Sequence, residues 1–245
     1  MRLPRDQIKA VVFDIGDTLI DATGIEEASL ERVVAHLARM GLAPPKCRLA
    51  RHYHKSAERR SASPNLNRLF GLPYGVFEEA CSEAGLKPKA TLIGYAAYQK
   101  FVREQIKRDP AIIRLFRNLR DLGLKIGIAS DGTTPEQLET LRKLGVLPRV
   151  DAVAISDEIG VLKPDGKLFD ALVTQLGVRP SEAMHVGDSW ERDVEGARNF
   201  GMTPVYVVRK PTSRRSRKGV PTVAFGNLQA LLDLLPRAPL PSTRR

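Results

Sequence analysis

Acidic, hydroxyl and amine side chains follow the short apolar runs of this sequence, and together they could bind a metal ion and a phosphate. They are Asp14, Asp17, Ser130, Asp131, Lys163, Asp188 and Asp193. Carboxylates that gather at one place repel each other unless a cation lies among them. Oxygen ligands at this density suit Mg²⁺. A lysine in such a group fits a phosphate or balances the negative charge.

The apolar runs have the length of buried β-strands. They are Ala10–Phe13, Lys125–Ala129, Ala152–Ile155, Ala183–Val186 and Pro204–Val208. Helical patterns separate most of them, which predicts an α/β fold with a mostly parallel, doubly wound sheet of the Rossmann-like kind. Ligands of such sheets bind beyond the carboxyl ends of the strands. We therefore expect the polar residues above to converge at one edge.

One interval breaks the alternation of strands and helices. Residues 22–107 show helical patterns and no convincing strand, which predicts an all-helical domain inserted after the first strand. The predicted core consists of residues 1–21 and 108–236, and residues 237–245 form a C-terminal tail.

Composition narrows the functional classes. The chain has 245 residues, of which 42% are hydrophobic, and a net charge of +11. Its two cysteines form neither a disulfide framework nor a CxxC pair, and no segment approaches a membrane span. We expect a cytoplasmic protein with no membrane partner. The positive charge favours anionic partners, but the sequence shows no nucleic-acid-binding module and no concentrated basic helix, so we expect no nucleic-acid partner.

Four segments carry a family resemblance. In order, "VVFDIGDTLI", "IGIASDG", "LKPDGKLFDAL" and "HVGDSWERDVEGARNFGM" resemble the four motifs of the haloacid dehalogenase-like (HAD) superfamily. The helical insertion after the first strand resembles the cap of subfamily I members. The acidic fourth motif is unlike that of the dehalogenase branch, so the resemblance points away from dehalogenation.

The resemblance implies a role for each matching residue. Asp14 matches the nucleophile that forms an aspartyl-phosphate and also binds Mg²⁺. Ser130 matches the hydroxyl that hydrogen-bonds the transferring phosphoryl group, and Lys163 matches the lysine that steadies it. Asp188 and Asp193 match the acidic pair that completes the metal site, directly or through water.

Two positions depart from the family pattern. Gly16 stands where family phosphatases commonly carry the aspartate that acts as general acid and base. It keeps the backbone carbonyl that binds the metal, but it lacks the carboxyl group. General acid–base catalysis by such a group typically raises the reaction rate by about 10²–10⁴-fold. Asp131 stands where asparagine is common and places another negative charge near the phosphate site.

Three replacements for the missing acid remain open. Asp17 could turn inward and act as the acid and base, although a turn residue bonded to nearby backbone is the favoured interpretation. A cap residue could supply the proton. Alternatively, the substrate could have a leaving group that needs little help.

We predict a Mg²⁺-dependent phosphatase that hydrolyses a small phosphomonoester through an aspartyl-phosphate intermediate. The alternative, motivated by Gly16, is a non-catalytic or very weakly active HAD-fold protein that binds a phosphorylated ligand or partner. The sequence leaves open the substrate, the choice between hydrolysis and phosphotransfer, and the oligomeric state.

One further segment is basic. "RHYHKSAERR" (Arg51–Arg60) either faces an anionic substrate at its non-reacting end or forms a solvated helix face. His185 lies within a predicted strand, where we expect a core histidine.

Overall fold

The computed structural model describes residues 8–61, 72–209 and 219–235. The chain divides into two units. One combines the chain up to Ile20 with the chain from Arg108 onward, and the other comprises Asp21–Lys107. The tail predicted at residues 237–245 lies outside the described residues.

The first unit is built on a six-stranded parallel sheet with the order β3-β2-β1-β4-β5-β6. The strands are β1 (Ala10–Phe13), β2 (Lys125–Ser130), β3 (Ala152–Ile155), β4 (Ala183–Gly187), β5 (Thr203–Val208) and β6 (Thr222–Ala224). β1 lies in the middle and is buried along its whole length. This arrangement explains the uninterrupted apolar character of its sequence, because a strand covered on both faces has no solvent side.

The register of the central strands brings their ends together. Phe13, the last residue of β1, pairs with Ile128 of β2 and with Val186 of β4. The residues that follow β1, β2 and β4 therefore leave the sheet at the same edge.

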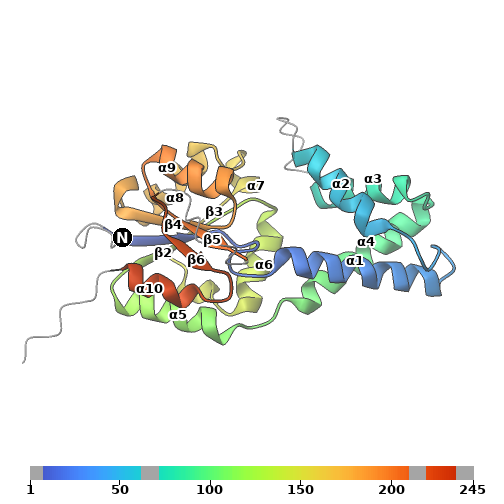
Figure 1. Cartoon of the computed structure of the whole chain (residues 1–245), viewed down its shortest axis with the longest axis horizontal. Helices are drawn as coiled ribbons and strands as arrows, with labels where there is room; N and C mark the ends of the chain where they lie inside the picture. The colour runs from blue at the N-terminus through green and yellow to red at the C-terminus, as the bar shows by residue number, and fades with distance from the viewer. Residues whose placement is uncertain (1–7, 62–71, 210–218, 236–245) are drawn as a thin grey trace, which may run out of the picture. The chain divides into compact units, whose positions relative to one another are not determined.

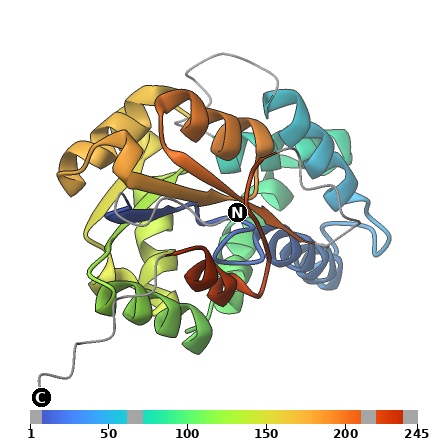
Figure 2. The same ribbon diagram turned by 60° about the vertical axis from the view of Figure 1, so that its left-hand side comes forward.

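Helices cover both faces of the sheet, with α8 and α9 on one side and α5 and α10 on the other (Figures 1 and 2). The helices of this unit are α5 (Pro110–Asp121), α6 (Thr134–Leu144), α7 (Ser156–Ile159), α8 (Gly166–Leu176), α9 (Gly196–Phe200) and α10 (Leu231–Leu234). Asp109 caps α5 by accepting the backbone N–H groups of Ala111 and Ile112, and Pro110 occupies the first helical position.

The second unit contains four helices in its described residues. They are α1 (Ala22–Arg39), α2 (Leu49–Ser61), α3 (Leu72–Glu83) and α4 (Pro88–Gln105). Apolar side chains such as Leu37, Phe77 and Tyr98 form its core. Met40 is half exposed, because α1 ends before it and Met40 is the C-cap.

The predicted fold class is confirmed, with small differences at strand ends. The structure extends β2 to Ser130 and β4 to Gly187, and it begins β5 at Thr203. β6 was not predicted, because this edge strand has only three residues and is too short to show a hydrophobic periodicity. None of the described helices is long and apolar enough to cross a membrane.

Candidate active site

Asp14 is the first residue after β1, and its side chain is buried. Its backbone N–H donates to the carbonyl oxygen of Val186 at 2.9 Å, which ties the strand end to β4. Burial raises the pKa of the Asp14 carboxyl, and the nearby ammonium of Lys163 offsets only part of this effect. The position therefore holds a carboxylate that water solvates poorly.

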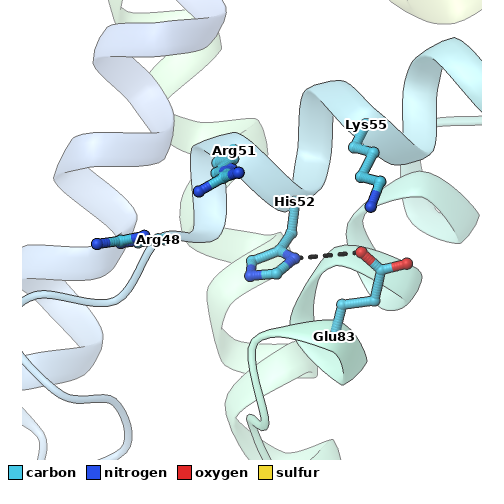
Figure 3. A pocket seen from close by; sticks show the side chains of 5 residues that line it. All are labelled: Arg48, Arg51, His52, Lys55 and Glu83. Carbon is cyan, nitrogen blue, oxygen red and sulfur yellow. Dashed lines mark hydrogen bonds and ion pairs between the residues drawn. The ribbon is translucent and has the colours of Figure 1, made fainter.

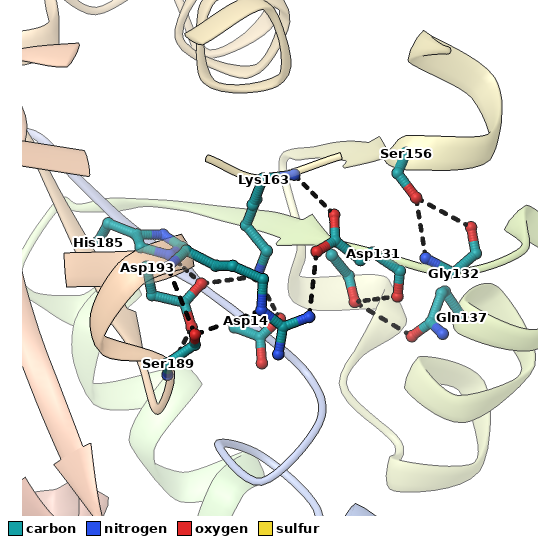
Figure 4. Close-up of polar contacts among 11 residues, drawn as sticks. Asp14, Asp131, Gly132, Gln137, Ser156, Lys163, His185, Ser189 and Asp193 are labelled. Carbon is teal, nitrogen blue, oxygen red and sulfur yellow. Dashed lines mark hydrogen bonds and ion pairs between the residues drawn. The ribbon is translucent and has the colours of Figure 1, made fainter. Parts of the chain in front are cut away.

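The side-chain nitrogen of Lys163 joins two carboxylates. Nζ donates to Oδ1 of Asp14 at 2.6 Å and to Oδ1 of Asp193 at 2.6 Å (Figure 4). Burial disfavours the charged amine, but the two carboxylates outweigh burial and raise the pKa of Lys163 above its usual range. Lys163 is therefore a buried, charged ammonium between two anions.

Asp193 lies in η4 (Trp190–Glu195), a π-helical turn that follows β4. Its Oδ2 accepts the backbone N–H of Ser189 at 2.9 Å, and its Oδ1 lies 3.0 Å from Nε2 of His185. Burial works to raise the pKa of Asp193, but Lys163 and His185 outweigh it and lower the pKa. These contacts hold Asp193 in its ionised form and in one orientation.

The close approach of Asp193 to the sheet requires a glycine at position 187. A Cβ atom added there would lie 2.3 Å from Cγ of Asp193. Gly187, the last residue of β4, therefore leaves the space that the carboxylate occupies.

Asp14, Asp188 and Asp193 each present one carboxylate oxygen, and these three oxygens lie within 4.8 Å of one another. Burial and, to a smaller extent, the carboxylates of Asp14, Asp193 and Asp17 together raise the pKa of Asp188 to about 7. A divalent cation would relieve this repulsion and the shift that it causes. Because every donor is an oxygen, the set fits Mg²⁺.

A second group of polar residues lies at the end of β2. The Ser130 hydroxyl donates to Oε1 of Gln137 at 3.3 Å. Oδ1 of Asp131 accepts the backbone N–H of Lys163 at 2.9 Å, and its Oδ2 lies 3.4 Å from Nη1 of Arg192. Of the predicted phosphate-binding residues, Asp131 is thus hydrogen-bonded to Lys163, and Ser130 precedes Asp131 at the end of β2.

Asp17 takes a different conformation from its neighbours. Its backbone φ is 54°, in the left-handed region, and it lies between Gly16 and Ile20, which form a parallel bridge. Its Oδ1 lies 2.9 Å from Nη2 of Arg209. Of the two interpretations of Asp17, this turn geometry favours the structural one.

Arg192 and Gln137 were not among the predicted site residues, and His185 was expected only as a core histidine. The available signal for Arg192 was a basic residue inside the acidic segment "GDSWERD". His185 is buried, as expected of a core histidine, but it also contacts Asp193. In the described part of the chain, its Nδ1 has no hydrogen-bond partner.

Fold and site together define a Rossmann-like α/β protein with a carboxylate–lysine centre near the carboxyl edge of its sheet and a helical insertion after the first strand. The chain belongs to the haloacid dehalogenase-like hydrolase family, whose model matches residues 8–201. The predictions of family, fold and hydrolase class are therefore confirmed.

Named relatives extend over most of the chain. It is 30% identical over 233 residues to the glyceraldehyde 3-phosphate phosphatase of Methanopyrus kandleri, covering 93% of this chain and 97% of that one. It is 31% identical over 224 residues to the phosphoserine phosphatase of Thermus thermophilus, covering 82% and 89% of the two chains. A solved HAD phosphatase from Thermococcus onnurineus superposes with a TM-score of 0.67 at 26% identity, covering 94% of this chain and 100% of the other.

Proposed function

We propose that this protein is a Mg²⁺-dependent phosphatase that hydrolyses a small phosphomonoester through an aspartyl-phosphate on Asp14. The observation that carries the proposal is the buried Asp14 carboxylate, held by Lys163 beside two further carboxylates. The phosphatase relatives in two different organisms support it.

In the proposed reaction, an oxygen of Asp14 attacks phosphorus, and the bond between phosphorus and the ester oxygen breaks. The alcohol leaves with a proton, and water then cleaves the aspartyl-phosphate to release phosphate and regenerate Asp14. Lys163 would neutralise charge on the transferring phosphoryl group, and the Ser130 hydroxyl would hydrogen-bond it. Such fixed donors supply much of the catalysis in phosphoryl transfer.

Asp14 and Asp188 would hold Mg²⁺ directly, together with the carbonyl oxygen of Gly16. Asp193 already accepts three hydrogen bonds, from Lys163, His185 and Ser189, so we assign it a contact through water. When bound, Mg²⁺ neutralises phosphate charge and draws the phosphate toward the nucleophile.

Gly16 supplies no acid for the leaving alcohol, and Asp17 pairs with Arg209. We therefore infer that the leaving group takes its proton from solvent. Turnover should then depend strongly on how acidic the leaving alcohol is.

The relatives support a proposal for the substrate class. One is named for glyceraldehyde 3-phosphate and another for phosphoserine, which are both three-carbon phosphomonoesters. We propose a substrate of similar size for this protein.

The test is phosphate release from glyceraldehyde 3-phosphate, O-phosphoserine and an aryl phosphate, with Mg²⁺ and with a chelator. We expect metal-dependent turnover, together with a phosphorylated Asp14 that can be trapped by rapid quenching and located by peptide mass spectrometry. Asp14→Asn should remove both signals. Absence of turnover and of trapped phosphate, in folded protein supplied with Mg²⁺, would instead support the ligand-binding alternative.

A further inference from the structure

The helical unit contains a pocket that the proposed reaction does not use. Its volume is about 430 Å³, which is within the range of small-molecule sites. It is lined by Arg48, Arg51, His52, Lys55 and Glu83 (Figure 3). None of these residues belongs to the centre around Asp14.

The basic residues share one face of α2. Arg48 directly precedes the helix, and Arg51, His52 and Lys55 follow at intervals of three or four residues. Residues at this spacing are neighbours on a helix surface. Part of the basic run noted in the sequence therefore lines a single cavity.

The one carboxylate of the pocket is already engaged. Oε2 of Glu83 lies 3.2 Å from Nδ1 of His52, and Oε1 forms an ion pair with Arg59. The hydrogen bond from His52 and, to a smaller extent, the contact with Arg59 lower the pKa of Glu83. Glu83 thus remains ionised, and its ion pairs are with His52 and Arg59 rather than with Arg48, Arg51 or Lys55.

Across residues 8–61, 72–209 and 219–235, no carboxylate forms an ion pair with Arg48, Arg51 or Lys55. Like charges at adjacent turns of a helix destabilise it. An anion in the pocket would remove this repulsion. Each planar guanidinium group can also donate two hydrogen bonds to two oxygens of one phosphate.

We propose that this pocket is an anion-binding site for a small molecule that carries two or more phosphate-type charges. It lies wholly within the helical unit and shares no residue with the proposed catalytic centre. The proposal concerns binding and does not depend on the reaction assigned to Asp14.

Binding of inorganic pyrophosphate to the full-length protein tests the proposal, measured by isothermal titration calorimetry with a chelator present. The test variant is Arg48→Gln/Arg51→Gln/Lys55→Gln. The matched control is Arg114→Gln/Arg117→Gln/Lys167→Gln, which removes the same charge from exposed positions of the other unit. Circular dichroism and thermal unfolding would establish that both variants fold like the wild type.

We expect the wild type and the control to bind pyrophosphate, and the pocket variant to bind at least about tenfold more weakly. Equal binding by both variants would place the anion elsewhere and overturn the proposal. Equal weakening of pyrophosphate binding in both variants would show a general charge effect and would also overturn the proposal. A wild type that does not bind pyrophosphate would overturn it as well.

Turnover of an aryl phosphate separates this site from the reaction centre. The pocket variant should keep the wild-type kcat and KM. A KM that rises only in the pocket variant would make the pocket part of the substrate site and would contradict a separate ligand.

Discussion

Asp14 and Asp17 lie three residues apart, yet the structure gives them different surroundings. Asp14 is buried against Lys163, whereas Asp17 lies in a left-handed turn and pairs with the exposed Arg209. Asparagine tolerates the left-handed conformation, and partly exposed ion pairs contribute only about 0–1 kcal/mol. Asp17→Asn should therefore preserve the fold.

We expect Asp17→Asn to lower kcat by less than about tenfold, because the turn role requires no proton transfer. Asp14→Asn should abolish turnover. The measurement is kcat on an aryl phosphate and on an alkyl phosphate, which differ in leaving-group acidity. A loss of about 10² or more, concentrated on the alkyl phosphate, would identify Asp17 as the general acid.

Arg192 and Asp131 form a second pair with a consequence for the substrate. The Asp131 carboxylate lies beside Ser130 and would repel a phosphate, and the guanidinium of Arg192 offsets this charge. Arg192→Gln should therefore raise KM by about tenfold while kcat changes less.

The control is a double-mutant cycle with Asp131→Asn, which keeps an oxygen that can accept the Lys163 backbone N–H. The double variant should have a KM closer to wild type than Arg192→Gln alone. Additive effects would show that the two side chains act independently.

At the scale of elements, β4 and η4 must meet closely to place Asp193. Gly187→Ala puts a methyl group where the Asp193 carboxyl lies, so we expect a destabilisation of about 1–3 kcal/mol and a large loss of turnover. Urea unfolding and steady-state kinetics would measure the two effects.

Gly166→Ala is the matched glycine control at the start of α8. There the nearest atom to an added Cβ is a ring carbon of Phe200 at 3.3 Å, which can shift slightly. This variant should keep near-normal stability and turnover. Comparable losses in both variants would contradict the specific role of Gly187.

At the scale of the whole molecule, Glu182 joins two segments that enter the sheet. Its carboxylate bonds to the side chain and backbone N–H of Arg179, and to Nζ of Lys9 at 2.8 Å. Hydrogen bonds from the Arg179 side chain and, to a smaller extent, from Lys9 lower the pKa of Glu182 from 4.5 to about 2. Because the folded-state pKa is the lower one, Glu182 stabilises the fold above about pH 4.5, and this contribution is lost as the pH falls toward 2.

Glu182→Gln should therefore reduce the free energy of unfolding at pH 7, and the difference from wild type should shrink as the pH falls below about 4.5. Urea unfolding from pH 7 to pH 3 would measure it. Glu158→Gln, at an exposed position of α7, is the control and should show little change. A difference that grows in acid would contradict the assigned ion pairs.

Much of the fold was predictable from local patterns. Buried strands such as Ala10–Phe13 and Ala152–Ile155 are apolar runs in the sequence, and the Asp-Pro pair at 109–110 that begins α5 is a local helix-start pattern. The edge strand β6 was not predictable, because three residues show no period and their pairing with β5 depends on a distant segment.

The sequence alone indicates that Asp14 and Asp188 follow strands and that Ser130 lies at a strand end, and parallel strands bring such residues to one edge. The contacts of Lys163 with Asp14, 149 residues away, and with Asp193, 30 residues away, could be seen only in the folded chain. The same is true of the pairing of Arg192 with Asp131 and of the pocket beside α2. Local periodicity reports which face of an element is buried, but contacts between distant side chains depend on sheet register, loop path and the space left by neighbours such as Gly187.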